Sequence, residues 1–270
     1  MSKYQFDKAE HLHQLDGKNL TGTTTVLSVL SKPLTYWASG LACQTLGWTK
    51  AGDWKKLKTQ EEKDVDLKRR IEHTTPAFEM IKSLSVEAYI SLLDKAYKAH
   101  AEKLETSAEE GTDMHSILEN YVKAKMQGKE SHLEGRLKCF EEWTDKNVDK
   151  FIGSETYCYS EELWIGGIVD AVVSLKSGEI ALVDFKSAKD AYDSHFYQLG
   201  GYSLQIEANG GYDEEGNQLF KIDKLISQHI VVPFGAKEPY PIVSRLVEDN
   251  KSAFKSCLNL YRIKDKLNKE

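Results

Sequence analysis

The sequence predicts a mixed α/β protein in which a central β-sheet is flanked by helices and preceded by a helical N-terminal region. Two observations support this prediction. Helical patterns dominate up to about residue 150, and three β-prone runs then follow, the last two joined by a tight turn. After these runs the pattern returns to a helix, a strand and a helix, which is the order expected of an α/β core.

Length and charge set the broad limits. The chain has 270 residues and a net charge of −6. This length fits one large domain or two small ones, and the pattern of elements leads us to expect a helical region over residues 1–108 and a core over residues 109–270. The acidic balance disfavours non-specific coating of nucleic acid but allows one strand to be held in a local groove. With no run of about 18 apolar residues and no secretory signal, we expect a cytoplasmic protein that does not bind membranes.

The first third of the chain is predicted to be largely helical. Three threonines over residues 23–25 offer N-caps to the apolar run over residues 26–30, before Pro33 interrupts the pattern. Residues 55–70 carry both charge signs, which is typical of a solvated helix face or a mobile excursion. Residues 84–104 resume a helical pattern.

The core is predicted to begin with two helices. Thr106 and Ser107 each have a glutamate three residues later, as in a capping box, so a helix should start there and end near Gly128. The next helix presents on one face Leu133, Leu137, Phe140 and Val148. The remaining elements are strands over 156–159, 163–173 and 179–186, a helix over 196–206, a strand over 225–232 and a helix over 243–267.

The cysteines and the first histidines do not predict a metal cluster. His11 and His13 lie two residues apart near the N-terminus, and we interpret them as ordinary residues. The cysteines are widely spaced and form no Cys-x-x-Cys pair. The four positions are Cys43, Cys139, Cys158 and Cys257.

The residues that suggest chemistry lie on the predicted strand hairpin. Asp170 is on its first strand, and Asp184 and Lys186 are on its second. Paired strands lie about 4.8 Å apart, so the two carboxylates can converge, and residues two apart on a strand point to the same face. Charges on an otherwise apolar strand are unfavourable unless something compensates them. Taken alone, however, Asp-x-Lys is more often a salt bridge at a sheet edge.

A hard divalent cation would compensate for these charges. Mg²⁺ prefers oxygen ligands, lowers the pKa of a bound water and neutralises a phosphate. Lys186 would orient that water or stabilise negative charge developing at phosphorus. The set suits phosphodiester hydrolysis, whereas a glycosidase has no use for a lysine beside its second acid.

Two further pairs of residues strengthen the hypothesis of a site. His115 and Glu119 lie one turn apart on a predicted helix, and a neutral imidazole can complete a metal shell. Gln198 and Tyr202 are also one turn apart, soon after the Asp-x-Lys strand. The glycines at 200–201 would weaken a helix by up to about 1 kcal/mol each. Either close approach of a backbone or ligand, or tight helix packing, would explain them.

These motifs, in this order, resemble the PD-(D/E)xK nuclease superfamily, and within it the RecB-like and Cas4-like exonuclease branch. The four motifs are Gly111-x-x-x-His115, Gly167-x-x-Asp170, Asp184-x-Lys186 and Gln198-x-x-x-Tyr202. They span about a third of the chain. The segment over residues 24–33, with Tyr36-Trp37-Ala38 after it, also resembles the opening of phage-type exonucleases of this branch. The branch also includes the mitochondrial genome maintenance exonuclease.

The resemblance implies a restriction-endonuclease-like core with a defined set of site residues. The implied ligands of Mg²⁺ or Mn²⁺ are His115, Asp170, Asp184 and the backbone carbonyl of Phe185. Lys186 would be the catalytic lysine, and Gln198 and Tyr202 would support the site and touch DNA. Glu119 and Trp37 are further candidates. Val169 stands where the family name has a proline, and no iron–sulfur cluster is expected because Cys257 has no C-terminal companions.

In relatives of this branch a helical region arches over the site and admits a strand end. Residues 35–108 are the candidate for such an arch. Trp37, Trp48 and Trp54 could stack on single-stranded bases or simply pack against helices. The basic residues there could contact phosphates or form a solvated helix face. They are Lys55, Lys56, Lys58, Lys68, Arg69 and Arg70.

The expected function is therefore a metal-dependent exonuclease acting on DNA ends, chiefly single-stranded, in recombination, repair or replication. The sequence has no Gly-x-x-x-x-Gly-Lys-Ser/Thr motif, so no nucleotide cofactor is expected and any helicase would be a separate partner. Two alternatives remain: an endonuclease of the same superfamily, such as a junction resolvase or restriction enzyme, and a catalytically silent DNA-binding module.

Overall fold

The computed structural model describes residues 4–31, 35–50 and 56–267. The chain divides into two compact units, which we call the sheet unit (residues 1–31 and 110–270) and the helical unit (residues 32–109). The division falls inside helix α4 (Val86–Met126). Among the described residues, no helix has both the length and the apolar character needed to cross a membrane.

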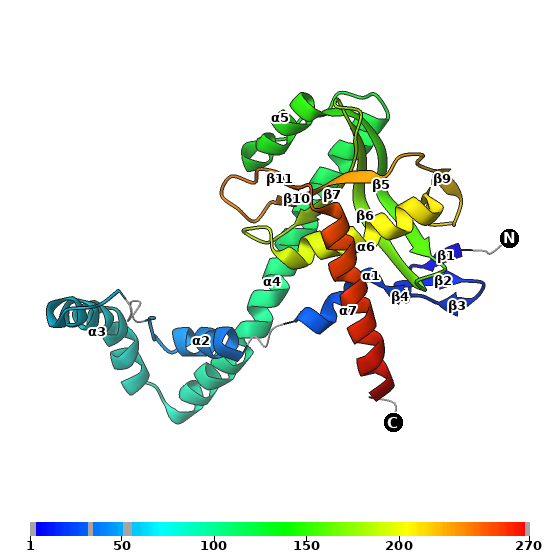
Figure 1. Ribbon diagram of the computed structural model, residues 1–270. Coiled ribbons are helices and arrows are strands. Elements are labelled where there is room, and N and C mark those ends of the chain that lie inside the picture. The colour runs from blue at the N-terminus through cyan, green and yellow to red at the C-terminus, as the bar shows by residue number, and fades with distance from the viewer. Residues whose placement is uncertain (1–3, 32–34, 51–55, 268–270) are drawn as a thin grey trace. The chain divides into compact units, whose positions relative to one another are not determined.

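The sheet unit is built on a mixed sheet of eight strands among the described residues, which confirms the expected α/β architecture (Figure 1). Its centre is an antiparallel meander of β5 (Val148–Ser160), β6 (Ile165–Leu175) and β7 (Ile180–Lys186). β10 (Ile226–Pro233) pairs in parallel with β7. The outer strands are β4 (Thr21–Gly22), β8 (Gly211–Tyr212), β9 (Gln218–Phe220) and β11 (Ile242–Ser244).

Helices cover both faces of this sheet (Figure 1). α6 (Asp193–Asn209) packs on one face, with α7 (Val247–Leu267) against it. The C-terminal part of α4 and α5 (Lys138–Asn147) pack on the other. β7 therefore contributes to two cores, with Val183 in one and Leu182 in the other. A strand buried on both faces is expected to be almost continuously apolar, so the charges at the end of β7 are exceptional for their place.

The N-terminal segment differs from the helical region expected over residues 1–108. β1 (Tyr4–Asp7), β2 (Leu12–Leu15) and β3 (Lys18–Asn19) form a small antiparallel sheet. They belong to the sheet unit, because Tyr4 and Leu15 are buried in a common cluster with Tyr159. Short strands of this kind are stabilised by such packing more than by local pattern.

The three threonines at 23–25 also differ from their expected capping role. α1 (Thr23–Val26) has Gly22 at its N-cap without a side-chain bond, and a 3₁₀ turn η1 (Leu27–Leu30) follows it. The Thr23 hydroxyl instead donates to the carbonyl of Gly166 at 3.0 Å. This contact ties the N-terminal segment to β6.

Two predicted helix starts and one helix face are wrong. α4 continues through the capping box expected at Thr106, whose hydroxyl donates to the Glu102 carbonyl one turn earlier at 2.9 Å, as threonines do inside helices. The side chains of residues 107–110 lie outside the described ones. Val148 begins β5 rather than ending the helix that follows the 3₁₀ turn η2 (Gly135–Leu137). Val243 lies in β11, and the last helix starts only at Val247.

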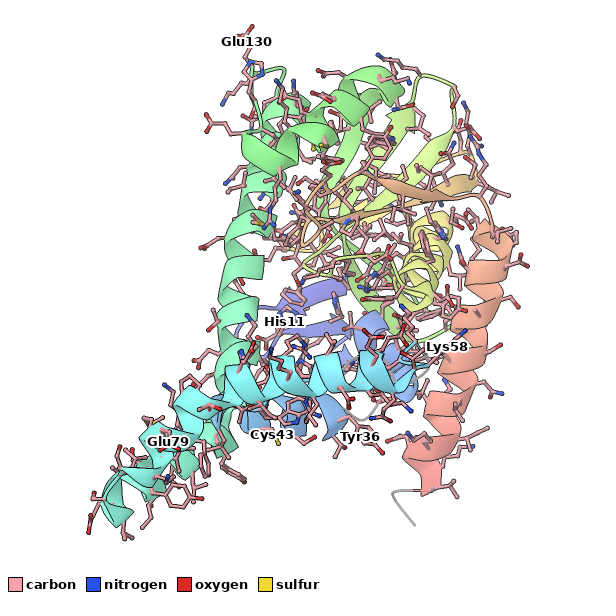
Figure 2. All side chains as sticks on the ribbon, turned by 90° about the vertical axis from the view of Figure 1, so that its left-hand side faces the viewer. His11, Tyr36, Cys43, Lys58, Glu79 and Glu130 are labelled. Atoms are coloured by element: carbon pink, nitrogen blue, oxygen red, sulfur yellow. The ribbon has the colours of Figure 1, made fainter. Side chains whose placement is uncertain are left out.

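The helical unit consists of α2 (Thr35–Thr45), α3 (Gln60–Lys82) and the first part of α4. α3 starts with a complete capping box between Thr59 and Glu62. Neither α2 nor α3 has a buried residue, and Figure 2 shows their side chains, Tyr36 and Glu79 among them, projecting from the ribbon. Pro33, Trp54 and Lys55 lie outside the described residues.

Candidate metal and phosphodiester site

Asp170 lies where β6 and β7 stop pairing. Their register ends with Ala171 opposite Val183, so Asp170 comes one residue beyond the paired region. The N–H of Phe185 donates to Oδ2 of Asp170 at 2.6 Å, which gives this end of β7 a side-chain acceptor. Oδ1 of Asp170 lies 3.1 Å from Nε2 of His115. Asp170 thereby connects β6, β7 and α4, as the sequence motifs suggested.

Asp184 and Lys186 form a close ion pair at the end of β7. Asp184 is only 1% exposed. The Lys186 ammonium group donates to its Oδ1 at 2.9 Å. Oδ2 lies 2.9 Å from the same nitrogen, yet it accepts no hydrogen bond from any described residue although it is fully buried. Buried carboxylate oxygens normally have a donor or a cation beside them, and here both oxygens of Asp184 depend on the single ammonium group of Lys186.

The electrostatics of the group follow from its burial. Burial raises the pKa of Asp184 to about 6, against the opposing charge of Lys186. Burial also disfavours charge on Lys186, but Asp184 and Asp170 outweigh it and raise the pKa of the ammonium group. The hydrogen bond to Asp170 raises the pKa of His115. Together, His115, Asp170, Asp184 and Lys186 form what we call the candidate centre.

A second acidic group adjoins the candidate centre through His115. Ligand atoms of His115, Glu119 and Glu155 lie within 4.8 Å of one another, and Lys123 forms ion pairs with both glutamates. Burial, followed by the charge of Glu119, raises the pKa of Glu155. Glu119 was a sequence candidate; Glu155 was not, because no motif surrounds it. On β5, the residues on either side of Glu155 pair with the residues on either side of Asp170. Glu155 itself has a positive φ of 42°, unlike the other residues of β5.

Gln198 and Tyr202 lie on α6 as expected and bond to each other, with Nε2 of Gln198 donating to the Tyr202 hydroxyl at 2.6 Å. Both are buried. The ring of Tyr202 packs on Gly167, where a Cβ would come within 2.5 Å of it. The glycines at 200–201 are explained by tight packing, because Cβ atoms there would collide with α7.

The aromatic and basic candidates of the arch belong to the helical unit. Trp37 and Trp48 are each more than one third exposed. Arg69 is paired with Asp66 and donates to the carbonyl of Lys50. The side chains of Lys56, Lys58 and Lys68 are exposed or partly exposed, as a solvated helix face would be.

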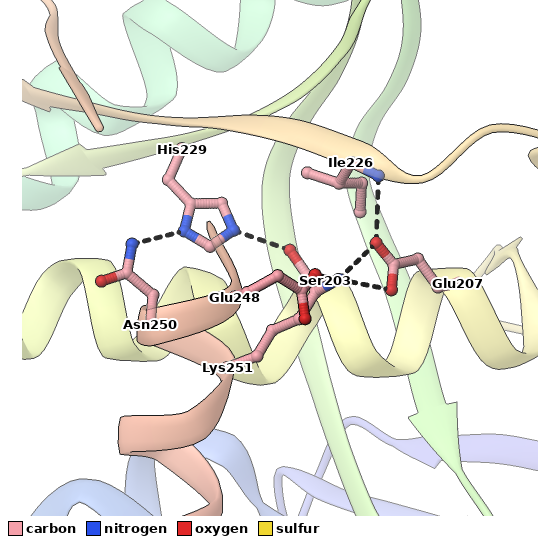
Figure 3. Close-up of polar contacts among 7 residues, drawn as sticks. All are labelled: Ser203, Glu207, Ile226, His229, Glu248, Asn250 and Lys251. Atoms are coloured by element: carbon pink, nitrogen blue, oxygen red, sulfur yellow. Dashed lines mark hydrogen bonds and ion pairs between the residues drawn. The ribbon is translucent and has the colours of Figure 1, made fainter. Parts of the chain in front are cut away.

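A separate buried network on α6, β10 and α7 has the residue types of a nucleophilic triad (Figure 3). Ser203 lies 2.7 Å from Nε2 of His229, and Nδ2 of Asn250 lies 3.0 Å from Nδ1. Since the Asn250 amide donates to Nδ1, the ring proton is on Nε2, and this N–H donates a hydrogen bond to the Ser203 hydroxyl. His229 therefore cannot accept the serine proton, and all three residues are buried. The network is structural.

Comparison with known proteins adds no family to these observations. No protein-family model matches the chain, and no match is found among curated proteins. The chemistry of the candidate centre therefore provides the basis for assigning a function.

Proposed function

We propose that this chain is a divalent-metal-dependent nuclease with a PD-(D/E)xK core, cleaving DNA from its ends in recombination, repair or replication. The observation that carries the proposal is the gathering of two carboxylates, Asp170 and the buried Asp184, around the single ammonium group of Lys186. Two carboxylates that share one ammonium group have acceptor oxygens to offer a hard cation such as Mg²⁺ or Mn²⁺.

The residues that would hold the ion are Asp170, Asp184, the carbonyl of Phe185 and His115. When bound, such an ion lowers the pKa of a water and neutralises negative charge on a phosphate. Asp170 is oriented for this role by His115 and by the Phe185 N–H. His115 would lose its proton on ligation, since only the neutral ring offers a lone pair.

Lys186 acts as a fixed cation in this scheme. Asp184 and Asp170 raise its pKa, which favours the protonated form that donates a hydrogen bond to a phosphate oxygen or to the attacking water. Water adds to phosphorus, the bond to the leaving sugar oxygen breaks, and that oxygen takes up a proton. The products are a phosphate monoester and an alcohol, so no further reactant is required.

The test is degradation of end-labelled single-stranded DNA by wild type and by Lys186→Ala, with Mn²⁺ or Mg²⁺ and with EDTA. Removing one charged donor from such a site lowers the rate by about 10²–10³-fold. Lys176→Ala is the matched control, because Lys176 is an exposed lysine at the other end of the same hairpin. Equal rates for wild type and Lys186→Ala, or full activity in EDTA, would exclude the proposal. Cleavage of circular single strands would indicate an endonuclease.

A further inference from the structure

One edge of β6 is open beside the candidate centre. β6 pairs with β7 from Ala171 onward and with β4 at Ile165 and Gly166. Between these two ladders, residues 167–170 of β6 pair with neither β4 nor β7. A pocket of about 230 Å³ opens at this stretch, lined by Gly166, Gly167 and Ile168 from β6.

The walls of the pocket come from segments that pack closely on those glycines. His13 of β2 and Tyr202 of α6 both line it, and each would lie 2.5 Å from a Cβ on Gly166 or Gly167 respectively. Tyr202 also feels the candidate centre, because the negative charge of Asp184 helps burial to raise the pKa of its hydroxyl. Ile168 lies two residues before Asp170, which is about 7 Å along a strand.

The chemistry of the lining suits an uncharged polar group. It contains no lysine, arginine, aspartate or glutamate, so it offers no fixed cation to a phosphate. Burial lowers the pKa of His13 to about 4, which keeps its ring neutral. Nδ1 of His13 faces the Tyr4 hydroxyl at 2.7 Å. With that hydroxyl as donor, the ring proton is on Nε2.

Hydroxyl groups and apolar surfaces complete the lining. Thr24 and Thr25 are exposed and can donate or accept, while Leu20, Ile168 and the Tyr202 ring are apolar. The volume is below the roughly 300–1,000 Å³ of sites for drug-sized ligands, so it suits one flat heterocycle. A nucleobase has apolar faces and an edge of mixed donors and acceptors.

We propose that this pocket receives the nucleobase of a nucleotide next to the cleaved phosphodiester, so that the enzyme holds its substrate by a base as well as by the backbone. The inference rests on the proposed nuclease function. It assigns to His13, Thr24 and Ile168 the positioning of the strand relative to Asp170. Cleavage then depends on the presence of a base at one defined position.

An abasic nucleotide moved stepwise along a single-stranded substrate tests this directly. Removing the base at the pocket position should lower kcat/KM roughly 5- to 150-fold, which corresponds to the loss of one base–aromatic stack, with smaller effects elsewhere. Thr24→Trp fills the pocket and should flatten this profile, as should Ile168→Phe, while Ser177→Trp on an exposed turn should leave it unchanged. A flat profile in the wild type, or an unchanged one in both filled variants, overturns the inference.

A binding measurement separates this inference from the nuclease proposal. Lys186→Ala is mixed with an oligonucleotide carrying 2-aminopurine at each position in turn, and fluorescence is recorded without hydrolysis. A change at one position that is lost on adding Thr24→Trp supports the pocket even if wild type cleaves no DNA. If wild type cleaves DNA normally but the 2-aminopurine fluorescence changes at no particular position, the nuclease proposal stands and the pocket proposal is wrong.

Discussion

Among single residues, Asp184 constrains the chemistry most. It is an acidic residue on β7, and its neighbours along this strand are buried in the cores on both faces of the sheet. Lys186 lies 2.9 Å from both of its oxygens, and the negative charge of Asp170 acts on the same group. Placing two acids beside one ammonium group is unfavourable unless a further cation compensates for the second charge. The stability of the protein should therefore respond to metal even where no substrate is present.

Adding Mn²⁺ should raise the melting temperature of the wild type, because an ion that binds only the folded state stabilises it by mass action. At 100-fold excess over Kd the shift should be about 5–10 °C. Asp184→Asn should lose most of the shift, whereas Asp149→Asn, at an exposed position on β5, should keep it. Differential scanning fluorimetry checks this. Equal shifts for wild type and Asp184→Asn would remove Asp184 from the ligand set.

The same shift should shrink on acidification. The pKa of Asp184 lies near 6 in the folded protein, so its carboxylate is ionised at pH 7.5 and largely protonated at pH 5. Proton and metal compete for it, and the protonated acid is the poorer ligand. The Mn²⁺-induced shift should therefore fall as pH drops through about 6. A shift of the same size at pH 5 and pH 7.5 would contradict this assignment.

Gly167 tests how closely the site is packed. A Cβ there would lie 2.5 Å from the Tyr202 ring and 2.7 Å from the Thr23 hydroxyl. Gly167→Ala should lower the free energy of unfolding by about 1–3 kcal/mol, as overpacking does. Gly40→Ala is the control, because nothing lies within 4 Å of that position in α2 and alanine favours helices. Urea denaturation compares the two; equal stability for both variants would show that Tyr202 can move aside.

At the residue scale, the placement of side chains could be predicted from the sequence where neighbours in the chain are neighbours in space. Asp184 and Lys186 lie two apart on one strand, and Asp170 reaches them across a hairpin, so local geometry brings them together. Glu155 could not be found in this way. It reaches His115 and Glu119 through the pairing of β5 with β6 and the docking of α4, and neither is encoded in its local pattern.

At the scale of elements, the same distinction holds. The meander β5–β7, the helix α6 and the strand β10 have strong periodic patterns and were predictable. β4, β8, β9 and β11 have two or three residues each, and such strands form only because a neighbour supplies the partner. The capping box at Thr106 was misleading because Ser/Thr followed by Glu also occurs inside long helices, where tertiary context decides.

The network that joins α6, β10 and α7 should make stability fall in acid. Burial, and then the charge of Lys251, lowers the pKa of His229 to about 3. The unfolded chain takes up this proton below about pH 6.5 and the folded chain does not. The free energy of unfolding should therefore fall by up to about 1.4 kcal/mol for each pH unit below 6.5, until about pH 3.

His229→Gln should remove this component of the acid sensitivity. Its deficit in unfolding free energy relative to wild type should be largest at neutral pH and narrow as pH falls from 6.5 to 4.5. His73→Gln, at an exposed helix position, should run parallel to wild type. Denaturant titrations at several pH values measure these differences. A deficit for His229→Gln that does not change with pH would mean that His229 takes up its proton as readily in the folded protein as in the unfolded chain.

On the scale of the whole molecule, burial is divided unevenly between the two units. The four clusters of buried apolar residues found among the described residues draw their members from the sheet unit. In the helical unit, α2 and α3 have no buried residue, and apolar side chains such as Val65, Ile71 and Phe78 are more than half exposed. A helix without buried contacts depends on its own weak propensity and capping.

Local opening should therefore cost much less in α3 than in the central sheet. Backbone amides of α3 should exchange with deuterium well before those of β6 and β7, whose apolar residues lie in the cores, because opening free energy follows the apolar contacts that must be broken. Hydrogen–deuterium exchange read by mass spectrometry tests this within one sample, with α6 as an internal helical control. If α3 is as protected as α6, its exposed apolar face must be covered in solution. Repeating the measurement with single-stranded DNA then shows whether protection changes in α3, as an arch over the strand would require, or only around β6.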